Sequence, residues 1–312
     1  MAGSPLNKPP NPPLNVPNAA NHSRLAEPIG LLAGWGRYPI VVAQELRRQG
    51  HRVVCTAVRD HADPALADLC DEFSWVGIGS IGGIIGRFRQ HGVERAVMAG
   101  KIHKVTFYNP GWWLRHRPDW TAARTFYRHF VTGTKDRKDD SLLLAIVHVF
   151  AESGIRFEPA TDFAPQLLVS SGQVAGKPLS VKQLRDVDFG WDLAKQMGGL
   201  DVGQTVCVKD QAVLAVEAIE GTDLCIRRAG ELCRQGGFTV VKVAKPQQDM
   251  RFDVPTVGLK TLESLAAAGG KVLAIEANST ILLDSREFQD AAAWLKLSVV
   301  ALHGQSAVQH VA

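Results

Sequence analysis

Short apolar runs alternate with amphipathic helical patterns through the first half of the chain. Runs of this kind are typical of buried strands, and strands that alternate with helices predict βαβ units around a parallel sheet. The expected strands cover residues 29–33, 51–58, 73–78 and 95–99, and the expected helices cover residues 39–48, 84–91 and 141–152. We therefore predict an α/β protein with a Rossmann-like parallel-sheet domain over residues 28–165.

The second half of the chain follows a more mixed pattern. Residues 166–180 are rich in Gly, Ser, Gln and Pro, which is typical of a linker. The expected helices after it cover residues 182–197, a segment that follows residue 223, and residues 261–268; the expected strands cover residues 206–208, 213–216, 239–244, 272–276 and 298–302. This order predicts a mixed α+β catalytic domain over residues 181–312.

Residues 1–27 are rich in Pro and Asn and lack the apolar segment of a signal peptide. Such a composition cannot bury enough apolar surface to fold, so we expect a disordered tail. The five cysteines form no CxxC pair, and no run elsewhere reaches the ~18 apolar residues of a membrane span. These features predict a cytoplasmic protein with reduced thiols.

Charge and motif content narrow the class of protein. The formal net charge is only +4, which argues against a general nucleic-acid binder, so no nucleic-acid partner is expected. The ten histidines form no HExxH or HxH pattern, and neither a GxSxG elbow nor a Walker A sequence occurs. The sequence therefore argues against a zinc enzyme.

A glycine pair follows the first expected strand. Gly34 and Gly36 would let backbone N–H groups approach a ligand, and the N-terminus of the next helix favours anions. Pro39 replaces the third glycine of the dinucleotide fingerprint, so a tight turn without a ligand explains the pair equally well. Lys101 ends the fourth expected strand, at the edge where parallel strands form a ligand crevice, although a lone lysine there is commonly just solvated.

A second group of candidate residues lies between a strand and a helix. Gly221, Thr222 and Asp223 open this helix, and Thr222 as N-cap would place Asp223 in the first turn. There the helix dipole favours an ionised carboxylate, which suits metal coordination or the orientation of a water molecule. The alternative is a helix-stabilising acid paired with Arg227.

A charged loop, residues 245–256, forms the third group. If this loop is extended, Asp249, Arg251 and Asp253 share one face, because side chains alternate along an extended chain. Arginine can grip phosphate with paired hydrogen bonds, Lys245 supplies a point charge, and carboxylates can hold a hard cation. A solvated loop with internal ion pairs fits the sequence equally well.

Four segments together carry a resemblance to a known family. They are GLLAGWGRYPIVVAQELRRQGHRVVC, DDSLL, DFGWDLAKQMGGLDVGQTVCVKDQAVLAVEAIEGTD and KVAKPQQDMRFDVPTVG. They resemble the UDP-2,3-diacylglucosamine pyrophosphatases built from two dedicated domains, as opposed to the calcineurin-like phosphoesterases that perform the same step. The resemblance spans roughly residues 28–303.

This resemblance implies hydrolysis of the pyrophosphate bond of UDP-2,3-diacylglucosamine to UMP and 2,3-diacylglucosamine 1-phosphate, in lipid A biosynthesis. It implies a need for Mg²⁺, a homodimer, and attack of water on the sugar-side phosphorus with substrate between the domains. The essential aspartate of the family falls on Asp223, which we expect to be catalytic and to bind the metal. The expected substrate-binding residues are Gly34, Gly36, Lys101, Asp139, Asp140, Gly221, Thr222, Lys245, Asp249 and Arg251.

Residues 101–138 depart from the family in length and aromatic content. The segment has nine Lys or Arg against two acidic residues, a net charge of +7, while the rest of the chain sums to −3. Trp and Tyr favour membrane interfaces, and cationic side chains are drawn to anionic headgroups. We expect this segment, including Trp112, Trp113 and Arg115, to contact the inner membrane peripherally; packing in the core or a dimer interface is the alternative.

Two other functions fit parts of the sequence. The Rossmann-like half also suits an oxidoreductase with a nucleotide cofactor, and the whole chain also suits a non-catalytic carrier of the nucleotide-sugar lipid. Nicotinamide absorbance in the purified protein would favour the first. Substrate binding without turnover in magnesium would favour the second.

Overall fold

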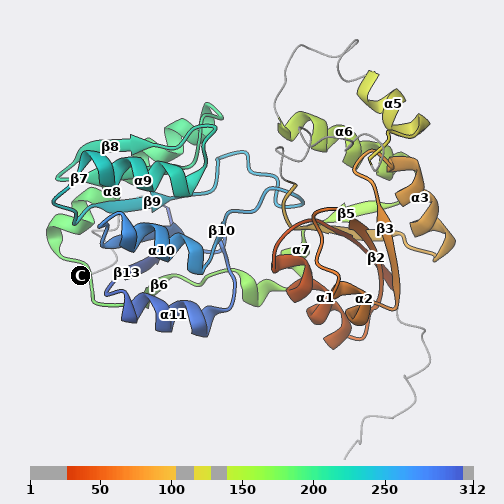
Figure 1. Cartoon of the computed structure of the whole chain (residues 1–312), viewed down its shortest axis with the longest axis horizontal. Coiled ribbons are helices and arrows are strands. Elements are labelled where there is room, and N and C mark those ends of the chain that lie inside the picture. The colour runs from red at the N-terminus through yellow and green to blue at the C-terminus, as the bar shows by residue number, and fades with distance from the viewer. Residues whose placement is uncertain (1–26, 103–115, 128–138, 305–312) are drawn as a thin grey trace, which may run out of the picture.

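The computed structural model describes residues 27–102, 116–127 and 139–304 of the chain. Figure 1 shows two α/β lobes, one formed by the first half of the chain and one by the second, with chain segments passing between them. Trp112, Trp113 and Arg115 of the predicted membrane segment lie outside the described residues. Within the described ranges, no helix is both long and apolar enough to cross a membrane.

The first domain is built on a five-stranded parallel sheet with the order β3-β2-β1-β4-β5. Its strands are β1 (Pro28–Ala33), β2 (Arg52–Val58), β3 (Glu72–Val76), β4 (Arg95–Ala99) and β5 (Arg156–Glu158). Strand β2 is buried from its second residue onward, as a parallel strand between two helical layers must be. The order reverses between β1 and β4, where sheets of this kind usually bind ligands.

Helices cover both faces of this sheet, as Figure 1 shows. One layer holds α1 (Tyr38–Arg48), α2 (Leu66–Leu69) and α7 (Ala160–Phe163); the other holds α3 (Ile81–Gln90), α5 (Trp120–Tyr127) and α6 (Asp139–Glu152). Helix α1 buries Val42 and Leu46, four residues apart on one face, so its periodicity alone accounts for its position.

The second domain has a six-stranded sheet with the order β6-β13-β11-β9-β7-β8. Its strands are β6 (Gly172–Ala175), β7 (Thr205–Lys209), β8 (Ala212–Val216), β9 (Thr239–Lys242), β11 (Val272–Glu276) and β13 (Ser298–Leu302). Strands β9, β11 and β13 are parallel, whereas β6, β7 and β8 join antiparallel. The sheet is therefore mixed.

One long helix covers one face of this sheet and three helices cover the other. The long helix is α8 (Val181–Gly199), and the three are α9 (Thr222–Leu232), α10 (Leu259–Ala267) and α11 (Ser285–Trp294). Helix α8 starts at a capping box, in which Ser180 and Gln183 each bond the other's backbone, so its first residue is fixed by local chemistry.

The predicted fold class is confirmed: a Rossmann-like parallel sheet is followed by a mixed α+β domain. The span 166–180 is more than the linker that its composition suggests, because β6 lies inside it and pairs antiparallel with β13. The first two residues of β6 are exposed and the last two only partly buried. A short edge strand with so little buried surface leaves almost no apolar signal in a sequence.

A small apolar cluster joins the two domains. Its buried residues are Ala164, Leu167 and Ile281, and the side chains packed against them are Tyr38, Val41, Leu168, Val254 and Leu283. Next to it, the two-residue strands β10 (Thr256–Val257) and β12 (Ile281–Leu282) pair in parallel. Because this cluster contains residues of α1 and of the loop before β10, it holds the charged loop of the second domain against the first.

Candidate active site

The end of β1 meets the end of β4 through backbone hydrogen bonds. The Gly34 N–H donates to the Ala99 carbonyl at 2.8 Å, and Trp35 and Lys101 exchange two bonds of 2.8 and 3.0 Å. A Cβ at Gly34 would lie only 2.8 Å from the Lys101 carbonyl oxygen. The close approach of two strand ends thus explains why glycine stands at this position.

Gly36 is glycine for a different reason. Its φ is +104°, in the region that L side chains rarely adopt, and the space around it is open. The next residue, Arg37, is the N-cap of α1, and its guanidinium pairs with Asp284 of the second domain at 2.7 Å. At the N-terminus of α1, where the sequence predicted phosphate binding, Arg37 therefore forms an ion pair that links the two domains.

Helix α9 begins one residue earlier than the sequence predicted, at Thr222. Gly221, with a φ of +85°, is the N-cap, and it caps no amide with a side chain. The prediction of Thr222 as N-cap was wrong because the Thr222 hydroxyl turns away from the helix and donates to Glu217 Oε1 at 3.0 Å. Asp223 lies in the first turn of α9, as expected.

A buried polar cluster lies at the end of β9, where Lys242 is its last residue. The Lys242 ammonium contacts the Thr222 hydroxyl at 3.3 Å and donates to the Thr256 carbonyl at 3.1 Å. Glu217 is also buried, and its Oε2 has no hydrogen-bond partner. Since buried polar atoms are nearly always paired, this orphaned oxygen marks a place where a further ligand or water is needed.

Burial lowers the pKa of Lys242 from its ordinary value, because desolvation penalises the charged form. Glu217, Asp223 and Asp253 oppose this effect, whereas the positive charge of Lys101 adds to it. Lys101 therefore lies close enough to act on Lys242, although it comes from the first domain. The structure brings together charged residues of both domains at one place.

Asp223 is a partly exposed carboxylate of this group. Its side chain is 34% exposed, and it pairs with Lys260 of α10 at 3.7 Å rather than with Arg227, the partner expected from helical spacing. A partly exposed carboxylate near a buried lysine is suited to position a cation or a water molecule.

The loop after β9 is a turn and not an extended segment, so the prediction that Asp249, Arg251 and Asp253 share an extended face was wrong. The Asp249 carbonyl accepts hydrogen bonds from the Phe252 and Asp253 N–H groups at 3.3 and 3.0 Å. Arg251 forms a bidentate pair with Asp249, and this hydrogen bonding lowers the pKa of the Asp249 carboxyl. The alternation rule failed because a local ion pair bends the chain.

Lys245 lies between two carboxylates, 2.7 Å from Asp201 and 3.6 Å from Asp253. Asp139 and Asp140 open α6, and only their backbone falls within the described part of the chain. Thr222 thus contacts Lys242, and the charges of Lys101, Asp223 and Asp253 act on it. The other three predicted residues, Lys245, Asp249 and Arg251, pair within their own loop or with Asp201, just after α8.

Sequence reasoning missed Lys242 and Glu217. Each left a signal: a lysine stands inside the apolar run of β9, between Val241 and Val243, and a glutamate directly follows the apolar β8. A charged residue continuing a buried strand is rarely tolerated without a partner. Such interruptions of an apolar run are a sequence signal for buried charge.

The expected Mg²⁺ can be tested against these side chains. Among the residues that the structure describes, no group of three or more His, Cys, Asp or Glu is placed to hold a metal ion. Mg²⁺ commonly binds one or two carboxylates and completes its coordination with waters and substrate phosphates. The exposed carboxylate of Asp223 fits this mode, and the unpaired oxygen of Glu217 lies in the same strand-to-helix connection.

The fold and site define a two-domain α/β protein in which charged residues of a Rossmann-like domain and a mixed domain meet. Comparison with known proteins narrows this class. The LpxI N-terminal domain profile matches residues 28–167, and the LpxI C-terminal domain profile matches residues 170–300. The chain belongs to the LpxI family.

A curated relative supports this assignment. The chain is 30% identical over 286 residues to the UDP-2,3-diacylglucosamine pyrophosphatase LpxI of Caulobacter vibrioides, covering 89% of this chain and 98% of the relative. Among solved structures, a UDP-glucose-4-epimerase of Stenotrophomonas maltophila with bound NAD and formylated UDP-arabinopyranose shares 14% identity over 49% of this chain and 40% of that one. Its TM-score is 0.27, too low to support any conclusion about this protein.

Proposed function

We propose that this protein hydrolyses the pyrophosphate bond of UDP-2,3-diacylglucosamine, giving UMP and 2,3-diacylglucosamine 1-phosphate for lipid A synthesis. The observation that carries the proposal is the meeting of Asp223, Lys242 and Lys101 at one place, in a chain that aligns along almost the whole of a relative with this activity. Two lysines and an ionised carboxylate match a reaction that must neutralise a pyrophosphate and position a water.

Lys242 and Lys101 would both stabilise the negative charge of the pyrophosphate. Lys242 is buried and held by Thr222 and the Thr256 carbonyl, so its ammonium is preorganised and has little freedom to lose on binding. Lys101 comes from the end of β4 and adds a second positive charge from the facing domain. A pyrophosphate held between them would be contacted by both domains.

Asp223 would orient the attacking water on the sugar-side phosphorus, and it is also the residue proposed to hold Mg²⁺. Bound there with substrate oxygens, Mg²⁺ would neutralise phosphate charge and lower the pKa of a bound water. Glu217 would support Asp223 indirectly, because it fixes the Thr222 hydroxyl at the first residue of α9.

Lys245 and Arg251 remain proposed phosphate contacts. Each is now paired with carboxylates, Lys245 with Asp201 and Asp253 and Arg251 with Asp249. A phosphate presents the same bidentate acceptor geometry to arginine as a carboxylate does, so exchange of one for the other costs little. The loop would then close over the substrate.

We further propose a homodimer in the cytoplasm that touches the inner membrane peripherally. The dimer is supported by an apolar surface beside the edge strand β8, where Ile219 is 99% exposed and Leu224 and Leu232 are also exposed. An unpaired edge strand flanked by exposed apolar side chains is a common surface for association.

The decisive experiment compares Asp223→Ala with Asp290→Ala, which removes an exposed carboxylate from α11, in assays with detergent-dispersed substrate. We expect Asp223→Ala to lower turnover by about 10³-fold and Asp290→Ala to leave it unchanged, since only the first removes a transition-state contact. EDTA should stop the unmodified enzyme. Normal turnover in Asp223→Ala would show that Asp223 only stabilises the start of α9. Full activity in excess chelator would exclude a role for Mg²⁺.

A further inference from the structure

A second cationic site lies on the first domain, at the carboxyl ends of β2 and β3. It is a pocket of about 400 Å³ whose wall includes Arg59, Arg87, Arg117, Trp75 and Ser80. None of the residues that line it in the described part of the chain is acidic. Three guanidinium groups around one pocket therefore create a strong local positive charge, which favours an anion.

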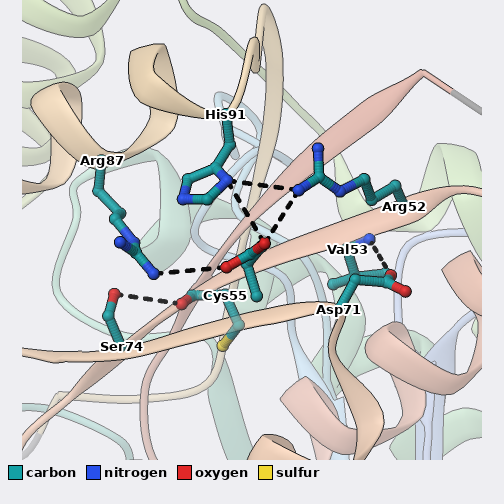
Figure 2. A network of polar contacts seen from close by, with 8 residues as sticks. Arg52, Val53, Cys55, Asp71, Ser74, Arg87 and His91 are labelled. Atoms are coloured by element: carbon teal, nitrogen blue, oxygen red, sulfur yellow. Dashed lines mark hydrogen bonds and ion pairs between the residues drawn. The ribbon is translucent and has the colours of Figure 1, made fainter.

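Arg87 shows that this charge is not fully neutralised. Glu72 pairs with Arg52 at 3.0 Å and with Arg87 at 3.6 Å, and it lies 3.7 Å from the His91 ring. Figure 2 shows the side chains of Arg52, Arg87 and His91 converging on one place. One carboxylate is shared by two arginines, and the Nε of Arg87 is buried without a hydrogen-bond partner. Buried donors without a partner are rare, so Glu72 does not satisfy every donor of Arg87.

The pocket wall is fixed by a buried histidine. His116 has a side chain with 0% exposure; it accepts the Ile78 N–H at 3.2 Å and contacts Asp60 at 3.2 Å. Asp119, three residues later, accepts the Gly83 N–H of α3 at 3.0 Å. These contacts anchor one side of Arg117 to the residues that follow β2 and β3 and the other side to α3, so the chain around Arg117 is fixed by the fold of the domain.

This pocket is separate from the candidate active site. Lys101 follows β4, and three strand spacings of about 4.8 Å separate β4 from β3 in the order β3-β2-β1-β4, which amounts to roughly 14 Å. A pyrophosphate bound at Lys101 and Lys242 does not reach that far. A phosphate group bound at this pocket would therefore be a different one from the pyrophosphate held at Lys101 and Lys242.

The helix beside the pocket presents an interfacial face. Trp120 is 83% exposed and Tyr127 is 63% exposed, and with Ala123 and Arg124 they follow the i, i+3, i+4, i+7 spacing of one helical face. The opposite side of α5 buries Ala122 against α3. Exposed Trp and Tyr next to arginines are typical of residues that sit at the headgroup level of a bilayer.

We propose that the pocket of Arg59, Arg87 and Arg117 binds the phosphate of an anionic phospholipid, while the exposed face of α5 enters the headgroup layer. Arginine is suited to this role because it binds phosphate in a bidentate manner and is always charged. The proposal rests on the peripheral membrane contact proposed above and gives it a location. The residues of the proposed hydrolytic site take no part in this membrane binding.

The test uses the full chain with phosphatidylcholine vesicles that contain or lack phosphatidylglycerol, measured by co-sedimentation. We expect binding only to the anionic vesicles, and the double variant Arg59→Ala/Arg87→Ala should weaken it by about 30-fold, since each arginine near a surface contributes roughly fivefold. Trp120→Ala should weaken binding as well. The matched control is Arg286→Ala/Trp294→Ala on α11, which removes an exposed arginine and a tryptophan that is 81% exposed, and it should bind normally.

Three results would overturn the proposal. The unmodified protein fails to bind anionic vesicles; the α11 control loses binding as strongly as the pocket variant; or calorimetry shows that the pocket takes inorganic phosphate or UMP while vesicles do not bind. Thermal unfolding identifies variants that fail to fold, for which Arg59→Gln/Arg87→Gln is the substitute. Turnover of detergent-dispersed substrate should stay normal in the pocket variants, so this assay reports on the proposed function independently of membrane binding.

Discussion

The two chain segments that flank the candidate active site are built in opposite ways. At the junction of β1 and β4, backbone groups bond each other and Gly34 lets the strands approach closely. At the junction of β9 and α9, Lys242 is buried and one oxygen of Glu217 has no partner. Burying charge costs free energy, so a fold keeps it mainly where function uses it. The first junction is a tight backbone contact that positions Lys101, and the second carries the buried charge of the proposed chemistry.

The largest effect that this comparison predicts comes from Lys242. Lys242→Met should lower turnover by about 10²–10³-fold, because a preorganised positive charge beside the reacting phosphates is lost. Lys271→Met, at an exposed position of the same domain, should leave turnover unchanged. The readout is kcat, with circular dichroism to confirm folding.

A buried carboxylate without its lysine is itself destabilising, so the double variant Lys242→Met/Glu217→Gln separates charge imbalance from catalysis. The double variant should regain any stability that Lys242→Met loses and remain inactive. Turnover close to normal in either variant would mean that the buried charge is structural, and the contrast between the two junctions would disappear.

A stability difference of intermediate size should appear at the first junction. Gly34→Ala forces a Cβ against the Lys101 carbonyl oxygen, which cannot move without breaking strand contacts, and should cost about 1–3 kcal/mol in the free energy of unfolding. Gly86→Ala, in the interior of α3 with open space around it, should instead stabilise the protein by about 0.5–1 kcal/mol. Denaturant titration measures both. Unchanged stability in Gly34→Ala together with a raised KM would show that the glycine serves a ligand.

The smallest effect concerns the loop pair Asp249–Arg251. Hydrogen bonding to Arg251 lowers the pKa of the folded Asp249 carboxyl below its usual value of 3.8, so the stabilisation is present above that value and is lost as pH falls through the lowered pKa. We expect Asp249→Asn to lose up to about 1 kcal/mol at neutral pH, and much less of it in acid below pH ~3. Urea titrations of both proteins across this range provide the measurement. A difference that stays constant with pH would mean that the ion pair contributes nothing.

The sequence by itself determined the framework of both domains. Strands β4, β11 and β13 fall on the residues predicted for them, because the central residues of a strand that is covered on both faces are apolar. The place of Asp223 in the first turn of α9 was also predicted correctly, since an acidic residue at a helix start is a local signal, although the N-cap is Gly221 and not Thr222. The family was also readable, because its motifs extend over many consecutive residues.

Only the tertiary structure decided which charges meet. Lys101 and Lys242 are far apart in the chain and lie on different domains, and no local pattern predicts that their charges act on each other. For residues 245–256 the sequence left two interpretations open, an extended charged face and a loop with internal ion pairs, and the turn with its Arg251–Asp249 pair decides for the second. Helices and strands follow from short-range periodicity and burial, whereas the position of a charge depends on which distant segments pack around it.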